Sequence, residues 1–88
     1  MRGMAVMRRR ITLGEWTGPG WASRNVGHVP GAGYVASILF DGNDIGQARN
    51  GEGGYSFELG EYPNEQYHGD YRTENAMLNA VAMQLIDR

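Results

Sequence analysis

Acidic and tyrosine side chains alternate between positions 58 and 74, and this pattern suggests binding chemistry more directly than any other in the chain. Residues 52–74 hold six acids and one arginine, a net charge of −5. Tyrosine gives an interface a large, amphipathic contact area, and acids attract basic groups. The predicted partner-binding residues are Glu58, Glu61, Tyr62, Glu65, Tyr67, Asp70, Tyr71 and Glu74. Their expected partner is a larger basic protein or a ribonucleoprotein complex; the alternative is a solvated loop with its tyrosines packed on the core.

A glycine-rich run near the middle of the chain offers a second kind of site. Its candidate ligand residues are Asn50, Gly51, Gly53 and Gly54. Exposed backbone N–H groups in such a run can hold a phosphate, with Arg49 and Tyr55 as neighbours for phosphate and base. The run lacks the Lys-Ser/Thr pair and the following helix of known phosphate-binding loops. Nucleotide or small-molecule binding and a plain turn both remain open.

Three consecutive arginines near the start, Arg8, Arg9 and Arg10, are candidates for contact with phosphate. Residues 1–33 carry five arginines and one acid, a net of +4, whereas residues 34–88 carry three arginines and nine acids, a net of −6. A nucleic-acid-binding module with an arginine arm is therefore an alternative function. The acidic remainder would repel nucleic acid, so direct binding is disfavoured. Pairing within the chain would also explain the charges.

Catalytic and metal-binding patterns are not found in the sequence. There is no cysteine, and the two histidines, His28 and His68, lie far apart in the chain. They would need Asp70 or Glu65 nearby to hold a metal. None of the serines stands in a nucleophile motif. We therefore expect no enzyme activity, no cofactor and no metal.

The elements that must position these residues can be read from periodicity. Residues 34–59 alternate apolar and polar side chains around the turns at 41–44 and 50–54, which predicts a three-stranded antiparallel meander. Residues 5–16 are expected to add a strand at one edge. Residues 71–87 are expected to form an amphipathic helix capped by Asp70 or Thr73. Two loops are expected, a Gly/Pro-rich one at 17–33 and an acidic, Tyr-rich one at 61–72.

The resulting fold class is α+β: an antiparallel sheet of about four strands, with one C-terminal amphipathic helix packed on one face. We expect a single domain over residues 1–88, with residues 1–4 open to disorder because Met1, Met4 and Met7 are alternative starts. The expected core is Ile11, Leu13, Tyr34, Ala36, Ile38, Phe40, Ile45, Tyr55, Phe57, Leu59, Met77, Leu78, Val81 and Leu85. An open sheet edge allows a homodimer.

The composition also bears on location. No apolar run approaches the roughly 20 residues needed to cross a bilayer, and the first ten residues lack the apolar segment of a secretory signal. The absence of cysteine suits a reducing compartment. We therefore expect a cytoplasmic protein that does not bind membranes.

The run YVASILFDGNDIGQARNGEGGYSFEL together with ENAMLNAVAMQLI resembles the β–β–β–α part of double-stranded-RNA-binding domains over about half the chain. Those domains begin this helix with lysines that bind phosphate, whereas the chain reads DYRTENA there. The helix that precedes their sheet is expected to be replaced here by a strand. RNA binding through the C-terminal helix is therefore disfavoured.

The same segment, through Asp41-Gly42, Gly46 and the turn at 50–54, also resembles small phage and mobile-element proteins, among them anti-CRISPR and other anti-defence inhibitors. This resemblance implies a non-enzymatic inhibitor of a host-defence complex that binds nucleic acid. It would act in the host cytoplasm and present its acidic surface to a groove lined by Arg and Lys.

Overall fold

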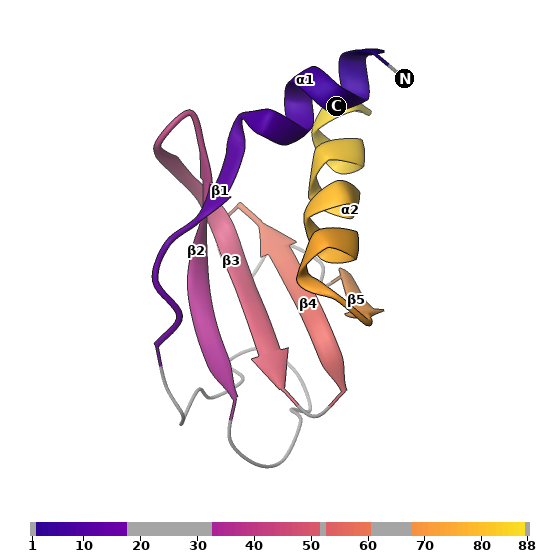
Figure 1. Cartoon of the computed structure of the whole chain (residues 1–88). Coiled ribbons are helices and arrows are strands. Elements are labelled where there is room, and N and C mark those ends of the chain that lie inside the picture. The colour runs from indigo at the N-terminus through magenta and orange to yellow at the C-terminus, as the bar shows by residue number, and fades with distance from the viewer. Residues whose placement is uncertain (1, 18–32, 52, 61–67, 88) are drawn as a thin grey trace.

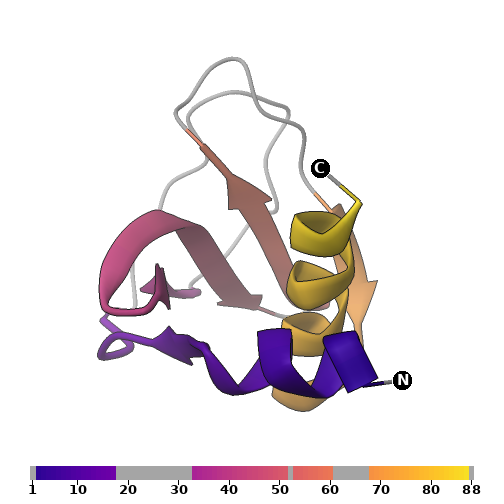
Figure 2. The ribbon, with the colours of Figure 1, turned by 90° about the horizontal axis from the view of Figure 1, so that it is seen from above.

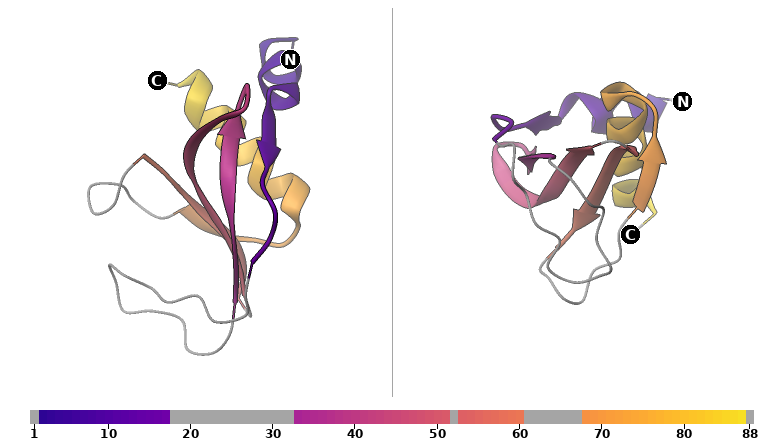
Figure 3. Two further views of the ribbon diagram at one scale, coloured as in Figure 1. Left: turned by 90° about the vertical axis from the view of Figure 1, so that its left-hand side faces the viewer. Right: turned by 90° about the horizontal axis from the view of Figure 1, so that it is seen from below.

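The meander expected over residues 34–59 is the centre of a larger antiparallel sheet. The computed structural model describes residues 2–17, 33–51, 53–60 and 68–87, and five strands pair within them in chain order (Figure 1). The strands are β1 (Ile11–Leu13), β2 (Tyr34–Phe40), β3 (Asn43–Gly51), β4 (Gly54–Leu59) and β5 (His68–Tyr71). They twist so that β4 turns away from β2 (Figure 3). The α+β class and the antiparallel sheet are confirmed.

Two helices flank the sheet in the described residues, where one was expected. They are α1 (Arg2–Arg9) and α2 (Glu74–Ile86). Met77, Leu78, Val81 and Ala82 of α2 are buried, and α1 crosses α2 when the molecule is seen from above (Figure 2). The Thr73 side chain accepts a hydrogen bond from the backbone N–H of Ala76 at 3.0 Å, which identifies Thr73 as the N-cap. Asp70, the other candidate, lies in β5.

The strand expected over residues 5–16 is wrong for most of its length, because residues 2–9 are helical and β1 has only three residues. Residues 2–4, which were open to disorder, belong to α1. Met4 and Met7 are three residues apart and both pack against the core, a spacing that suits a helix. A helix therefore precedes the sheet, where a strand was expected.

The loop expected over residues 61–72 is also partly wrong. His68–Tyr71 form β5, which pairs with β4 through Tyr55 with Tyr71 and Phe57 with His68. Residues 61–67 lie outside the described residues, as do residues 18–32 of the expected loop at 17–33. β1 and β5 are the two edges of the sheet. The homodimer expected from an open edge stays a prediction.

The first turn is a tight hairpin, as predicted, but it has two residues where the turn was expected over 41–44. β2 and β3 close with Phe40 paired to Asn43, so that Asp41 and Gly42 form the turn with φ angles of 51° and 84°. Positive φ at both positions suits a turn whose twist matches the strands. One extra residue, Ile45, is accommodated between the pairs Ile38–Gly46 and Leu39–Asp44 as a bulge.

The core lies between the sheet and α2. Its buried apolar residues are Ile11, Ala36, Ile38, Ala48, Phe57, Leu59, Met77, Leu78, Val81 and Ala82. Five expected core residues are only partly buried, namely Leu13, Phe40, Ile45, Tyr55 and Leu85. The prediction of Tyr34 as a core residue is wrong, because its side chain is 42% exposed. Neither α1 nor α2 is long and apolar enough to cross a membrane, and no other helix occurs in the described residues.

A candidate aromatic and acidic surface

The predicted partner-binding residues are distributed differently from the expectation. Glu61, Tyr62, Glu65 and Tyr67 lie outside the described residues. Of the other four, Asp70 and Glu74 are exposed and Tyr71 is half-buried, whereas Glu58 is only 2% exposed.

The prediction of Glu58 as a surface acid is wrong. It lies between Phe57 and Leu59 in β4, so alternation turns its side chain to the face opposite the apolar core. There Glu58 Oε1 accepts a hydrogen bond from Arg49 Nη2 of β3 at 3.4 Å, and both side chains are almost completely buried. Arg49, expected as a neighbour for phosphate, is thus engaged in this ion pair. Alternation predicted which face Glu58 occupies, but not that its side chain would be buried there.

Tyrosines and one asparagine form a row across the sheet. Tyr34 pairs with Asn50, Asn50 with Tyr55, and Tyr55 with Tyr71, so the row crosses β2, β3, β4 and β5. Residues directly opposite one another in a sheet share a face. The Tyr71 ring stacks on the buried Phe57 ring with centroids 6.0 Å apart. The row therefore continues the core side of the sheet outward to positions that are exposed or half-buried.

Trp16 adds a second aromatic layer and was not among the predicted binding residues. Its ring meets Tyr55 edge-on with centroids 6.2 Å apart. Its indole N–H donates to Glu74 Oε1 at 3.2 Å. The backbones of Thr17 and Val35 exchange two hydrogen bonds of 2.9 Å, which fixes the segment beside β2. A tryptophan placed just after a strand and just before a glycine-rich segment was the signal that could have identified it.

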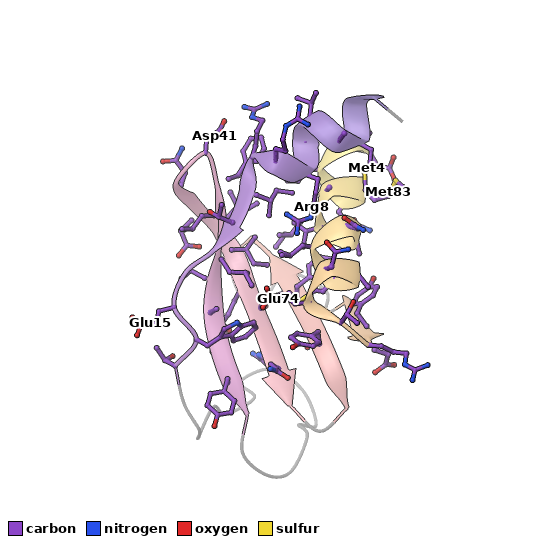
Figure 4. All side chains as sticks on the ribbon, in the orientation of Figure 1. Met4, Arg8, Glu15, Asp41, Glu74 and Met83 are labelled. Carbon is purple, nitrogen blue, oxygen red and sulfur yellow. The ribbon has the colours of Figure 1, made fainter. Side chains whose placement is uncertain are left out.

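Glu74 lies at the start of α2, where it accepts the Trp16 indole N–H (Figure 4). It occupies the first turn of α2, directly after the N-cap, where the helix dipole favours a negative charge. Among the described residues only Arg10–Asp41 and Arg49–Glu58 form ion pairs, so Glu74 has no cationic partner there. We call the set Trp16, Tyr34, Asn50, Tyr55, Tyr71 and Glu74 the aromatic–acid surface. Asp70, exposed and with φ of 72°, precedes Tyr71 at its edge.

The glycine-rich run is positioned by the sheet. Gly51 ends β3 and pairs with Gly54 at the start of β4, and Gly53 is an exposed turn residue. Gly54 has φ of 105°, and a Cβ there would lie 2.6 Å from the Tyr71 carbonyl oxygen. The close approach of β4 and β5 therefore requires glycine at this position, and no ligand is needed to explain it. Asn50 is the member of the run that joins the aromatic–acid surface.

The three candidate phosphate-binding arginines do not form one cluster. Arg8 donates to the Ile11 carbonyl oxygen and to Asn75 Oδ1, each at 3.4 Å, and Arg9 is exposed. Arg10 pairs with Asp41, its Nε lying 3.0 Å from both carboxylate oxygens. The hydrogen bond from Arg10 lowers the pKa of Asp41 and raises the pKa of Arg10. The charge of Arg10 is therefore already balanced within the chain.

The described residues contain no cluster of three or more His, Asp or Glu side chains that could hold a metal ion. The aromatic–acid surface can instead provide flat aromatic contacts, one amide and one carboxylate. No protein-family model, no curated protein and no solved structure matches this chain.

Proposed function

We propose that the chain is a non-enzymatic binding protein that docks on a larger, basic protein through its aromatic–acid surface. One observation carries the proposal: Trp16 meets the tyrosine row at Tyr55 and donates its indole N–H to a carboxylate, Glu74, that forms no ion pair with any described residue. Aromatic side chains are enriched at protein interfaces, and Trp and Tyr are enriched among the few residues that supply most of the binding energy.

The charge of the chain supports a basic partner. Residues 34–88 carry a net charge of −6 from three arginines and nine acids. Complementary charge speeds association and selects against wrong partners more than it adds affinity. Aromatic contacts would therefore supply the affinity and the acids would supply the selectivity.

The finer proposal concerns the class of the partner. A surface that pairs acids with aromatic rings presents to an arginine-lined groove the same features as a nucleic acid, which are negative charge and flat rings. We propose that the chain competes with nucleic acid for such a groove and so inhibits a host-defence complex. This is the function that the resemblance to phage anti-defence proteins implies.

The test is capture of partners from a lysate on the tagged chain at low and at high salt, followed by mass spectrometry. We expect one basic complex, retained at low salt and released at high salt. Trp16→Ala and Glu74→Gln should abolish or strongly weaken its capture. The matched controls are Met83→Ala, an exposed side chain near the other end of α2, and Glu15→Gln, an exposed acid that points away from Glu74 (Figure 4). Equal loss in the controls would contradict the proposal.

A second candidate, binding of a nucleotide or another flat small molecule, is favoured by the position of Asn50 between Tyr34 and Tyr55. Tyrosine rings could stack on a base while the amide forms hydrogen bonds to its edge. A nucleotide in the low-salt eluate, lost in Asn50→Ala and kept in Gly53→Ala, would favour this function over protein binding.

A further inference from the structure

Glu74 and Trp16 form a pair whose chemistry indicates what they contact. The carboxylate accepts the indole N–H at 3.2 Å and is exposed at the start of α2. The Trp16 ring is half-buried and is held edge-on by Tyr55. The hydrogen bond fixes the carboxylate beside an aromatic ring that still has surface to offer.

The chain contains the same combination of groups in a completed form at its hairpin tip. The Arg10 guanidinium lies 4.4 Å from the centroid of the Phe40 ring and pairs with the Asp41 carboxylate. A ring, a carboxylate and a guanidinium therefore assemble there. At the start of α2 the ring and the carboxylate are Trp16 and Glu74, and among the described residues no guanidinium pairs with Glu74.

We propose that Trp16 and Glu74 receive one arginine side chain of the basic partner, stacked on the indole ring and paired with the carboxylate. This inference rests on the proposed function and names the group that anchors it. Tryptophan is the ring that attracts cations most strongly. Arginine fits better than lysine because its guanidinium is planar, stacks on rings and offers a fork of donors to a carboxylate.

The indole N–H of Trp16 provides a direct reporter of this contact. The 88-residue chain carrying Trp21→Phe has a single indole signal in a two-dimensional NMR spectrum, because only Trp16 remains of its two tryptophans. The probes are N-acetyl-arginine amide and the corresponding lysine derivative, both of which carry one positive charge on the side chain. We expect a saturable shift with the arginine probe and a several-fold weaker response to the lysine probe.

Two variants decide whether the contact is the one proposed. Glu74→Gln keeps an oxygen that can accept the indole N–H but removes the charge, and it should abolish the arginine preference. Glu15→Gln removes the charge of an exposed acid that is next to Trp16 in the chain, and it should leave the response of the indole signal unchanged. An equal response to both probes, no saturable response, or a preference retained in Glu74→Gln would overturn the inference.

This experiment separates the inference from the proposed function. If a basic complex is captured but the Trp16 indole signal does not respond to arginine, the arginine site is wrong and the protein-binding function stands. If the arginine probe binds as expected but no basic protein is captured, the site stands and the proposed function fails.

Discussion

Two arginine–carboxylate pairs of this molecule lie in opposite settings. Arg49 and Glu58 join β3 to β4 through a contact of 3.4 Å, and their side chains are 6% and 3% exposed. Arg10 and Asp41 join the start of β1 to the hairpin tip, and both side chains are 46% exposed. The exposed pair has the better geometry, because its Nε lies 3.0 Å from both oxygens and its guanidinium covers Phe40.

The comparison shows that good geometry does not make an ion pair important for stability. An exposed pair exchanges contacts with water for contacts with each other and gains little. Both members of a buried pair have lost their water, so the contact between them matters for stability even where it is long. Removing one member should therefore have a much larger effect in the sheet than at the hairpin tip.

The largest expected effect is that of Glu58→Ala. It removes the carboxylate to which the buried Arg49 guanidinium donates and should lower the free energy of unfolding by about 3–5 kcal/mol, the range for removing one member of a buried ion pair. Urea unfolding followed by circular dichroism measures the change. Because such a loss can unfold a small domain altogether, the double variant Arg49→Met with Glu58→Leu provides the second measurement. It should recover most of the stability, since apolar residues of similar size often replace a buried pair at no cost.

The contrary result would be a double variant no more stable than Glu58→Ala. Burial of the charge would then not be the cause, and the side-chain shapes at these two positions would matter instead. A matched single change at an exposed acid, Glu15→Ala, should leave unfolding within the scatter of the measurement.

The same contrast explains how much could be predicted from sequence. Alternation and turn residues correctly predicted the three strands β2, β3 and β4 and a hairpin within residues 41–44, because these follow from local rules. The prediction of Glu58 as a surface acid was wrong because alternation assigns a side chain to a face of the sheet but cannot tell whether the side chain is buried there. The prediction for residues 2–9 was wrong because a pattern of only eight residues fits a helix and a strand almost equally well. The pairing of β5 with β4 depends on backbone contacts that leave no periodic signal in four residues.

The site was predicted only in part for a related reason. Tyr71 and Glu74 were expected as binding residues from composition, whereas the contact of Trp16 with Glu74 joins positions 58 residues apart. Nothing local to either residue encodes that contact. It follows from the antiparallel bridge that sets Thr17 beside Val35 and from the packing of α2 on the sheet.

The next effect in size tests the close contact of β3 and β4 beside the buried pair. A Cβ at Gly46 would lie 2.2 Å from the backbone oxygen of Glu58, so Gly46→Ala must push the two strands apart. We expect a loss of about 1–3 kcal/mol in the free energy of unfolding, the usual range for overpacking. Gly53→Ala is the control, because nothing lies within 4 Å of a Cβ there. An unchanged urea midpoint for Gly46→Ala would mean that the strands are farther apart in solution.

A smaller effect is expected from the glycine next to the exposed pair. Gly42 has room for a Cβ, but its φ of 84° is a conformation that L-residues rarely adopt. Gly42→Ala should therefore cost about 1 kcal/mol through backbone strain alone. Gly42→Asn should recover part of the loss, since asparagine tolerates positive φ. Equal midpoints for the two variants in urea unfolding would contradict a strain-based cost.

The smallest effect at neutral pH is that of Asp41→Asn, and pH dependence is its signature. Asparagine also tolerates the φ of 51° at this position, so the change removes charge with little backbone strain. Because the hydrogen bond from Arg10 lowers the pKa of Asp41 in the folded state, the stabilisation is fully present above the unfolded pKa of about 3.9 and is lost as pH falls through the folded value. The urea midpoints of the two proteins should differ by a constant amount above about pH 5 and converge below about pH 4.

Arg10→Gln should give the same convergence, because it removes the other member of the pair. A difference that is independent of pH in both variants would show that Asp41 supports the hairpin tip through its shape and not through its charge.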